Sequence, residues 1–380
     1  MTRSPLLVGP LPPPVHGLAV AFGSLVDELR RRAEVFDLVD LFPNKVPGAA
    51  VSAGWCRAMD LASVWPRLYR YLLGGRRTVY VTVAQARGGF IRDALVIWPA
   101  ALLRHRIVAH LHGGNYDTFF TRQTGPWRWL IRHTLRRIDR MIVLGDGLRT
   151  MFAFDEVVSR RVVVVPNGTA RVPLPDRAPR VKGQMTVLYL SNLIESKGWL
   201  EVLEAIAAIR AAGVDATARF AGQFLANPSD DRRVKSSAHA RALFVQRVAE
   251  LGLDDSVAYV GLVQGERKAA LLAEAEVLVL PTSYDAEGQP VAIIEALAAG
   301  CVVVSTAYRA IPDVVRHERT GLLIPGRDAD ALAVALQRLA DDPAWADQLA
   351  RSARTDWEER LAIDRHADAV WGHITMWGDE

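Results

Sequence analysis

The sequence has few cysteines, no long apolar run and no large excess of one charge. Only two cysteines occur in 380 residues, which is too few for a disulfide-stapled fold and favours a reducing compartment. The longest uncharged apolar run, 94–103, is far shorter than the roughly 20 residues of a membrane-spanning helix. Prolines between Pro10 and Pro14 interrupt the first apolar stretch before it reaches signal-peptide length. We therefore expect a soluble, intracellular protein.

The net charge of +4 hides an unequal distribution along the chain. Residues 1–180 contain 26 Lys and Arg against 13 Asp and Glu, whereas residues 181–380 contain 20 against 29. This asymmetry predicts an anionic partner for the first half, such as an anionic membrane surface. P-loops, dinucleotide-binding GxGxxG loops and zinc-spaced cysteines are missing, and no nucleic-acid motif occurs, so no nucleic-acid partner is expected.

The stretch 119–140 mixes arginines with large apolar side chains. This composition is more typical of a membrane-surface helix than of a nucleic-acid reader, although a solvated basic face over buried tryptophans would look similar. We predict reversible attachment to an anionic bilayer that requires Arg132, Arg136 and Arg137. The apolar residues expected to contribute are Phe119, Phe120, Trp127, Trp129 and Ile131.

Short apolar runs alternate with amphipathic segments throughout, which predicts parallel sheets covered by helices on both faces. The fold class is therefore α/β, with two doubly wound Rossmann-like domains facing a cleft. We place the first domain at 1–172, a proline-rich basic linker at 173–183, the second domain at 184–356, and a C-terminal helix at 357–380 that packs back on the first domain. The runs expected to be strands are 5–9, 78–82, 106–111, 140–144, 161–165, 185–190, 216–221, 257–260, 277–280, 301–305 and 321–324.

The stretch 281–306 carries the clearest chemical pattern. An apolar strand is followed by a polar loop, and then Pro290 opens a helix that Gly300 closes. The start of this helix offers backbone N–H groups to an anion. Glu287 precedes the turn and Glu295 follows it, so the two carboxylates can bind hydroxyl groups on either side of that anion. A nucleotide sugar has this layout, with a diphosphate between two sets of hydroxyl groups; a capping acid and a solvated glutamate are the plainer alternative.

The same stretch resembles the E-x7-E motif of the retaining glycosyltransferases of family four, which have the GT-B fold. Other blocks resemble this family in the same order along nearly the whole chain. They are GPLPPPVHG at 9–17, HLHGGN at 110–115, VVPNGT at 164–169, SNLIESKG at 191–198 and HERTGLLIPGRDADAL at 317–332. The bacterial polysaccharide and glycoconjugate enzymes of the family are the most similar in their first glycine loop.

The resemblance implies a retaining transferase that moves a sugar from a nucleoside diphosphate donor, UDP in preference to GDP, to an acceptor hydroxyl. The second domain would hold the donor and the first domain the acceptor, a glycan or a lipid-linked intermediate of polysaccharide synthesis. Catalytic roles are implied for His112, Lys197 and Glu287. The residues implied to bind the donor are Gly17, Asn192, Lys197, Gly288, Gln289, Pro290, Val291 and Glu295, and those on the acceptor side are His16, Gly113 and Asn115.

The chain departs from the family pattern at two places. The phosphate loop has Asn192 where the family has an arginine, which leaves Lys197 as the obvious cation there. After Thr306 the family has glycines and a glutamate, whereas this chain has Tyr308 and Arg309, so Arg309 either supplies charge to the site or belongs to an ordinary surface loop.

Many other glycosyltransferases bind a divalent metal through Asp-x-Asp, and Asp328-Ala329-Asp330 has this spacing. It also begins an amphipathic run, so helix capping explains it better. Asp230 and Asp231 lie in a polar insertion, 227–237, that we predict to be mobile. We therefore expect no metal and no other cofactor.

Two other functions remain compatible with these residues. One is a GT-B-type nucleotide-sugar epimerase, and the other is a nucleotide-sugar-binding protein without turnover. The sequence does not determine the oligomeric state. The predicted location is the cytoplasm, either free or attached to the inner face of the cell membrane.

Overall fold

The computed structural model describes residues 3–13, 17–42, 54–171, 180–227 and 230–376, and for 54–63 it describes the backbone alone. The chain divides into two compact units. Unit 1 comprises Met1–Ala170 and Ile363–Glu380, and unit 2 comprises Arg171–Ala362. Within the described residues, no helix is long and apolar enough to cross a membrane.

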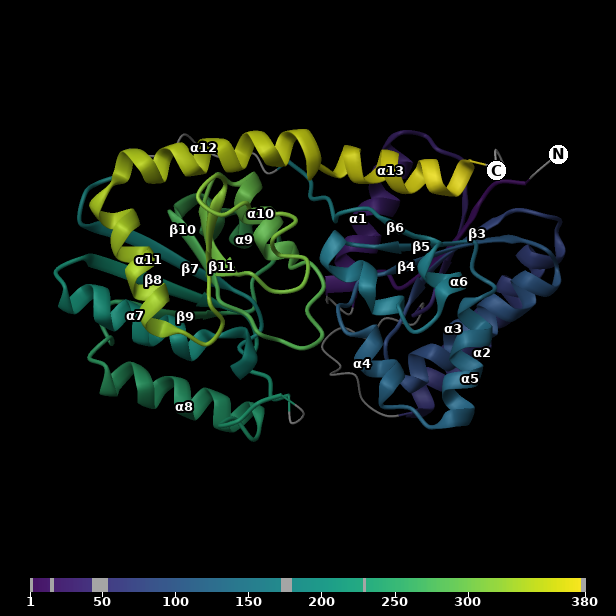
Figure 1. The fold of residues 1–380 in the computed structure, drawn as a ribbon, viewed down its shortest axis with the longest axis horizontal. Coiled ribbons are helices and arrows are strands. Elements are labelled where there is room, and N and C mark those ends of the chain that lie inside the picture. Colours follow the sequence, from purple (N-terminus) through teal and green to yellow (C-terminus); the bar gives the residue numbers. More distant parts are fainter. Residues whose placement is uncertain (1–2, 14–16, 43–53, 172–179, 228–229, 377–380) are drawn as a thin grey trace. The chain divides into compact units, whose positions relative to one another are not determined.

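Unit 1 is built on a six-stranded parallel sheet in the order β2-β1-β3-β4-β5-β6 (Figure 1). All paired strands run parallel, as expected for apolar strands separated by helices. The strands are β1 (Leu6–Gly9), β2 (Asp37–Asp40), β3 (Thr78–Val83), β4 (Arg106–Leu111), β5 (Arg140–Val143) and β6 (Val162–Val164). The helices are α1 (Gly17–Arg31), α2 (Gly54–Leu73), α3 (Arg87–Leu102), α4 (Tyr116–Thr121), α5 (Gly125–Leu135), η1 (Asp146–Phe152), α6 (Glu156–Ser159) and α13 (Ile363–Thr375).

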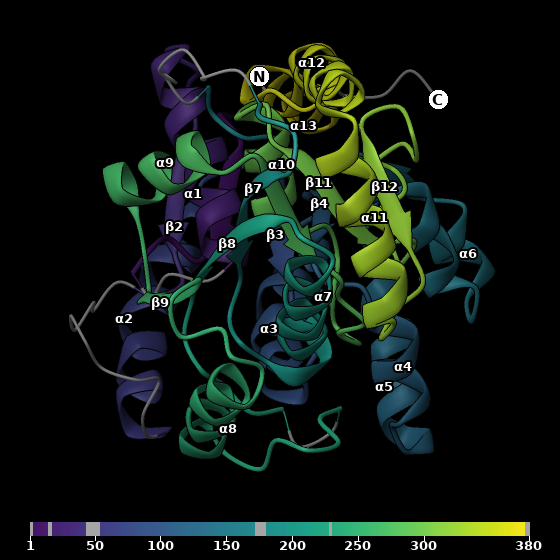
Figure 2. The same ribbon diagram turned by 90° about the vertical axis from the view of Figure 1, so that its left-hand side faces the viewer.

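Unit 2 repeats this architecture with the strand order β12-β11-β10-β7-β8-β9, again all parallel (Figure 2). The strands are β7 (Gln184–Leu190), β8 (Asp215–Ala221), β9 (Val257–Gly261), β10 (Val277–Leu280), β11 (Val302–Thr306) and β12 (Gly321–Ile324). The helices are η2 (Glu195–Lys197), α7 (Trp199–Ala211), α8 (Ser237–Glu250), α9 (Gly265–Glu274), α10 (Val291–Ala298), α11 (Ala329–Asp341) and α12 (Pro343–Arg360). The strand order reverses between β7 and β10, so the loops after these strands meet at the edge where open α/β sheets bind ligands.

The predicted α/β class with two doubly wound parallel sheets is confirmed, and each run expected to be a strand contains one. The sequence analysis missed β2, a four-residue edge strand with an aspartate at each end, because charged residues interrupt its apolar pattern. The start expected for the last helix, 357, is wrong. Trp357 belongs to α12 and is buried in the core of unit 2, and the division between the units falls at 362/363.

Helix α13 completes the core of unit 1. Ala367, Val370 and Ile374 are fully buried among side chains of α1 and the central strands. Arg32, directly after α1, also pairs with Asp368 of α13. The core of unit 1 therefore includes a segment that begins at Ile363, although the rest of the unit ends at Ala170.

The structure corrects the expected membrane contacts of 119–140. Phe119, Phe120 and Ile131 are buried in the core, so they cannot enter a bilayer while unit 1 is folded. Trp129 is exposed, and Trp127 is half-buried against Phe90. All three named arginines already have intramolecular partners. Arg132 donates to the Phe154 carbonyl at 3.1 Å, Arg136 pairs with Asp155 at 2.8 Å, and the guanidinium of Arg137 lies 3.6 Å from the centre of the Trp98 ring.

We expect Val370→Ala to weaken unit 1 by about 1–3 kcal/mol, because the missing methyl groups leave a cavity between α13 and the sheet. Hydrogen exchange of the amides of β1 and β3 measures this loss within unit 1 alone. Val334→Ala, at an exposed valine of α11, is the matched control and should change exchange little. Unchanged protection of β1 and β3 in the Val370 variant would contradict the proposed contribution of α13 to this core.

Candidate functional site

In unit 2 the loop after β7 is pressed against the loop after β10. Gly198 adopts a left-handed conformation with φ of +81°, and a Cβ atom there would lie 2.6 Å from the carbonyl oxygen of Pro281. The backbone N–H of Ser283 donates to the carbonyl of Ser196 at 2.7 Å. A glycine is therefore required at 198 for both its backbone conformation and the close approach of the two loops.

This contact places Lys197 beside Glu287, two residues that the sequence analysis assigned to catalysis. Their side chains form an ion pair, with 3.2 Å between Lys197 Nζ and Glu287 Oε2, and both are largely buried. The hydroxyl of Thr282 donates to the same carboxylate oxygen at 3.1 Å. Lys197 Nζ also lies 5.1 Å from the centre of the Tyr284 ring. The cation and the carboxylate are therefore held in one geometry by neighbouring side chains.

Helix α10 begins directly after this pair. Its N-cap is Pro290, as the sequence analysis expected, and Gly300 follows its end in the left-handed conformation. Gly288, Gln289 and Pro290 are buried and Val291 is half-buried. The first turn of a helix has N–H groups without intrahelical acceptors and carries a positive dipole end, so this segment suits an anion.

Glu295 lies in the second turn of α10, half-buried, and pairs with Lys268 of α9. The structure thus places Glu287, the first turn of α10 and Glu295 along one loop and helix, in the order that the sequence pattern predicted. The expected ribose contact of Glu295 stays a prediction.

The insertion after β8 is tied to the same edge of the sheet, contrary to the mobile loop expected at 227–237. The Glu195 carboxylate accepts backbone N–H groups of Arg232, Arg233 and Val234 at 2.6–2.9 Å. Burial by itself would raise the pKa of the Glu195 carboxyl, but these N–H groups and the Arg233 guanidinium hold that pKa below its ordinary value. The described part of the insertion is thus fixed by buried acid-to-backbone bonds.

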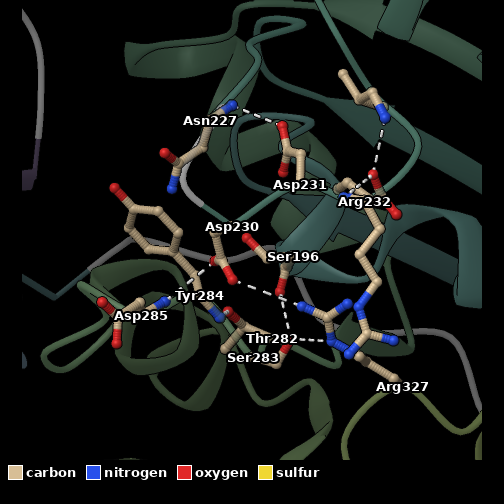
Figure 3. A network of polar contacts seen from close by, with 12 residues as sticks. Ser196, Asn227, Asp230, Asp231, Arg232, Thr282, Ser283, Tyr284, Asp285 and Arg327 are labelled. Carbon is tan, nitrogen blue, oxygen red and sulfur yellow. Dashed lines mark hydrogen bonds and ion pairs between the residues drawn. The ribbon is translucent and has the colours of Figure 1, made fainter.

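Asp230 connects this insertion to the loop after β10, as Figure 3 shows. Its carboxylate accepts the backbone N–H of Asp285 at 3.3 Å and lies 3.6 Å from Arg327, while Arg327 Nε donates to the Ser283 hydroxyl at 3.0 Å. Glu195 and Arg327 were not singled out from the sequence, and Asp230 was considered there only in connection with a metal site. Their roles depend on contacts between residues 37 to 97 positions apart, for which no local spacing gives a signal.

Arg309 lies in the loop after β11, next to the loop that carries Tyr284 and Glu287. It has a left-handed backbone with φ of +52°, a conformation that costs a non-glycine residue about 1–2 kcal/mol. Its guanidinium has long contacts of 3.4 Å with a carboxylate oxygen and the carbonyl of Asp285, and its Nε atom is buried without a hydrogen-bond partner. Lys197 contacts Tyr284 and Arg309 contacts Asp285, so two cations flank adjacent residues of one loop.

Two further expectations concern polar residues near this edge. The Asn192 side-chain oxygen accepts the backbone N–H of Gln223 at 3.3 Å, so it binds the neighbouring loop. Asp328 caps α11 by accepting the Ala331 N–H at 2.8 Å, which confirms the capping interpretation. Among the described residues, no group of three or more His, Cys, Asp or Glu side chains is positioned to hold a metal ion.

In unit 1, His112 follows β4 and stacks on His110, with 4.0 Å between ring centres. Tyr80 Oη lies 2.7 Å from His110 Nδ1, which fixes that ring, and His366 of α13 lies 5.9 Å from it. His366 Nδ1 donates to the Pro166 carbonyl at 2.6 Å. Burial lowers the pKa of His112 to about 3 and that of His366 to about 4, and it holds the pKa of His110 well below its ordinary value.

The other expected residues of unit 1 have different surroundings. A Cβ atom on Gly113 would lie 2.1–2.4 Å from the side-chain amide of Gln85, and that amide also accepts the Asn115 N–H at 3.3 Å. Gln85 follows β3 and was not singled out from the sequence. Gly17 begins α1, and a Cβ atom there would meet nothing within 4 Å. His16 lies outside the described residues.

Comparison with known proteins agrees with this architecture. The fold resembles sucrose-phosphate synthase of Thermosynechococcus elongatus, with a TM-score of 0.74 and 21% identity over 98% of both chains. It also resembles HepE of Anabaena, solved in complex with UDP and glucose, with a TM-score of 0.72 and 14% identity over 98% of this chain and 100% of that one. These are GT-B structures, so the expected GT-B fold is confirmed.

Residues 184–342 match the family described as Glycosyl transferases group 1. The putative colanic acid biosynthesis glycosyltransferase WcaL of Salmonella typhimurium is 26% identical over 276 residues, which is 71% of this chain. The match spans 63% of that relative, less than two thirds of its length. The second half of the chain is therefore similar to the group 1 glycosyltransferases, and the resemblance to glycosyltransferases noted in the sequence is confirmed.

We expect the histidine cluster to make unit 1 less stable at acidic pH. The folded-state pKa of His366 is about 4 and its ordinary value is 6.5, so the unfolded chain binds a proton that the folded chain excludes. The contribution of the neutral His366 ring to the free energy of unfolding is fully present above pH 6.5 and is lost as the pH falls toward 4. His366→Phe should reduce the fall in unfolding free energy between pH 7 and pH 5 by about 2 kcal/mol.

Urea unfolding at the two pH values measures this difference. Trp371→Phe on the same helix is the control, since it changes packing against Phe36 without removing a histidine. An equal pH dependence in wild type and His366→Phe would show that protonation of this cluster does not control acid stability.

Proposed function

We propose that this protein is a retaining glycosyltransferase that transfers a sugar from a nucleoside diphosphate sugar to an acceptor hydroxyl. The observation that carries the proposal is the buried Lys197–Glu287 pair directly before the first turn of α10. A diphosphate requires cations and N–H donors, and the sugar attached to it requires a carboxylate for its hydroxyl groups. The pair and the helix start supply all three where the loops after β7 and β10 meet.

The reaction assigns one task to each of these groups. The acceptor oxygen forms a bond to the anomeric carbon while the bond from that carbon to the phosphate oxygen breaks, and the acceptor proton passes to the leaving phosphate. Lys197 and the N–H groups of 288–291 stabilise the charge on the departing diphosphate. Glu287 orients the sugar hydroxyls and Glu295 the ribose. Attack on the face of the leaving group retains the anomeric configuration.

The donor base and the acceptor are proposed from similar proteins. HepE was solved with UDP, which supports a uridine donor in preference to a guanosine donor. The relative WcaL is named for colanic acid biosynthesis, which supports a glycan or lipid-linked acceptor in bacterial polysaccharide synthesis. We accordingly propose a cytoplasmic location with reversible attachment to the inner face of the cell membrane.

Side-chain cations are proposed to neutralise the diphosphate, so no metal is required. Lys197 is one cation, and Arg309 is proposed as the second, in place of the arginine that the family has at Asn192. The strained backbone and weak contacts of Arg309 leave its guanidinium available for a phosphate. His112 in unit 1 keeps its predicted role at the reacting carbon.

The first functional test is release of UDP from UDP-sugars. We expect release only in the presence of acceptor, full activity in EDTA, and a fall in kcat of about 100-fold or more for Lys197→Ala, the effect of removing one group that stabilises transition-state charge. Lys182→Ala, at an exposed lysine of unit 2, is the matched control.

Epimerised donor without acceptor would identify an epimerase, and donor binding without turnover would identify a binding protein. Loss of activity in EDTA with rescue by Mn²⁺ would overturn the metal-free mechanism.

The second test concerns Arg309. Arg309→Gln should weaken UDP binding about tenfold, the effect of losing one charge-assisted hydrogen bond, and leave uridine binding unchanged because uridine has no phosphate. Isothermal titration calorimetry measures both affinities. Arg338→Gln, at an exposed arginine of α11 that pairs with Glu318, controls for the general loss of a positive charge. An unchanged UDP affinity in Arg309→Gln would assign Arg309 to loop structure instead.

A further inference from the structure

Helices α2, α3 and α5 cover one face of the unit 1 sheet. The connections β2-α2-β3, β3-α3-β4 and β4-α4-α5-β5 all step in the same direction along the sheet, so right-handed crossovers put their helices on one side. The three helices lie together in Figure 1, whereas α1 and α13 lie elsewhere in unit 1. Trp98 Nε1 donates to the Thr134 hydroxyl at 3.0 Å, which joins α3 to α5.

The outer side of α3 is apolar and exposed. Ile91, Leu95 and Leu102 are 47%, 45% and 74% exposed, and their spacing places them on one side of the helix. The opposite side of α3 carries the buried residues of its packing against the sheet. A helix that is apolar on both sides is normally covered on both sides. Within the described residues, the outer side of α3 is not covered.

The two neighbouring helices also carry exposed large apolar side chains. Trp129 on α5 is 58% exposed, and Leu73 at the end of α2 is 73% exposed. Arg76 Nε donates to the Arg104 carbonyl at 3.1 Å, so the turn after α2 meets the turn after α3, near Leu73 and Leu102. We call Leu73, Ile91, Leu95, Leu102 and Trp129 the α3 patch.

The α3 patch lies in strongly basic surroundings. Residues 64–77, 87–106 and 121–138 contain a single acid, Asp93, and thirteen arginines, of which nine are exposed. Asp93 is buried and pairs with Arg92 at 2.7 Å, so it presents no negative charge to the surface. A partner of this surface must therefore combine anionic groups with an apolar phase. Nucleic acid offers the phosphates but no apolar phase for leucine and isoleucine side chains.

We propose that unit 1 binds an anionic lipid bilayer through the α3 patch. The apolar side chains enter the boundary between headgroups and acyl chains, and the surrounding arginines pair with lipid phosphates. This inference rests on the membrane attachment in the proposed function and moves its apolar contacts from 119–140 to α3. The surface is separate from the donor residues of unit 2, so each can be tested without the other.

Sedimentation with vesicles tests the proposal. Wild type should sediment with vesicles of phosphatidylglycerol and phosphatidylcholine at low salt, less at high salt, and not with phosphatidylcholine alone. Leu95→Glu combined with Leu102→Glu should lower the bound fraction at least tenfold, although all arginines remain. Val245→Glu combined with Val334→Glu is the matched control, because both valines are similarly exposed on helices of unit 2.

Binding of UDP, measured by thermal shift, should be equal in all these variants, which separates vesicle attachment from folding and from the donor site. Wild type that remains in the supernatant with phosphatidylglycerol vesicles at low salt would overturn the proposal. Equal sedimentation of wild type and the Leu95/Leu102 variant would overturn it as well. So would a valine control that loses as much of its vesicle-bound fraction as the Leu95/Leu102 variant does. Failure to bind UDP in every variant and in wild type would count against the proposed function and leave the vesicle result to be judged on its own.

Discussion

The close approach of two loops at Gly198 is the constraint on which the proposed donor site of unit 2 depends. With no side chain at 198, the backbone after β7 reaches Pro281 and Ser283, and Lys197 is brought to Glu287. Any Cβ atom at this position would separate the loops and move the cation away from the carboxylate. The start of α10 adds its N–H groups to the same place because β7 and β10 are adjacent strands.

Two acids, one buried and one half-buried, hold the surroundings of this pair in position. Glu195 and Asp230 bind backbone N–H groups of neighbouring loops and arginine side chains, so the described part of the insertion after β8 is attached to the sheet edge by several bonds. Carboxylates used in this way are satisfied within unit 2. Lys197 and Arg309 differ from them in carrying positive charge beside the loop before α10, where the proposed diphosphate would bring the phosphates that complete their coordination.

Unit 1 uses its two helical faces differently. On one face, α13 returns from the far end of the chain and buries Ala367, Val370 and Ile374, and it brings His366 to the histidines that follow β4. On the other face, α3 packs inward through buried side chains and keeps an exposed apolar side among arginines. The same sheet thus supports a closed core on one side and a surface suited to a partner on the other.

The sequence by itself determined the α/β class, the two domains, nearly all strands and the order of Glu287, Pro290 and Glu295, because these depend on local periodicity and on residues close together in the chain. The capping role of Asp328 was local in the same way. Only the tertiary structure decided that Phe119, Phe120 and Ile131 are buried, that Glu195 fixes the insertion after β8, and that His366 joins His110 and His112. Each of these outcomes depends on which segments meet across the sheet, and a contact between residues tens to hundreds of positions apart leaves no periodic signal in a single sequence.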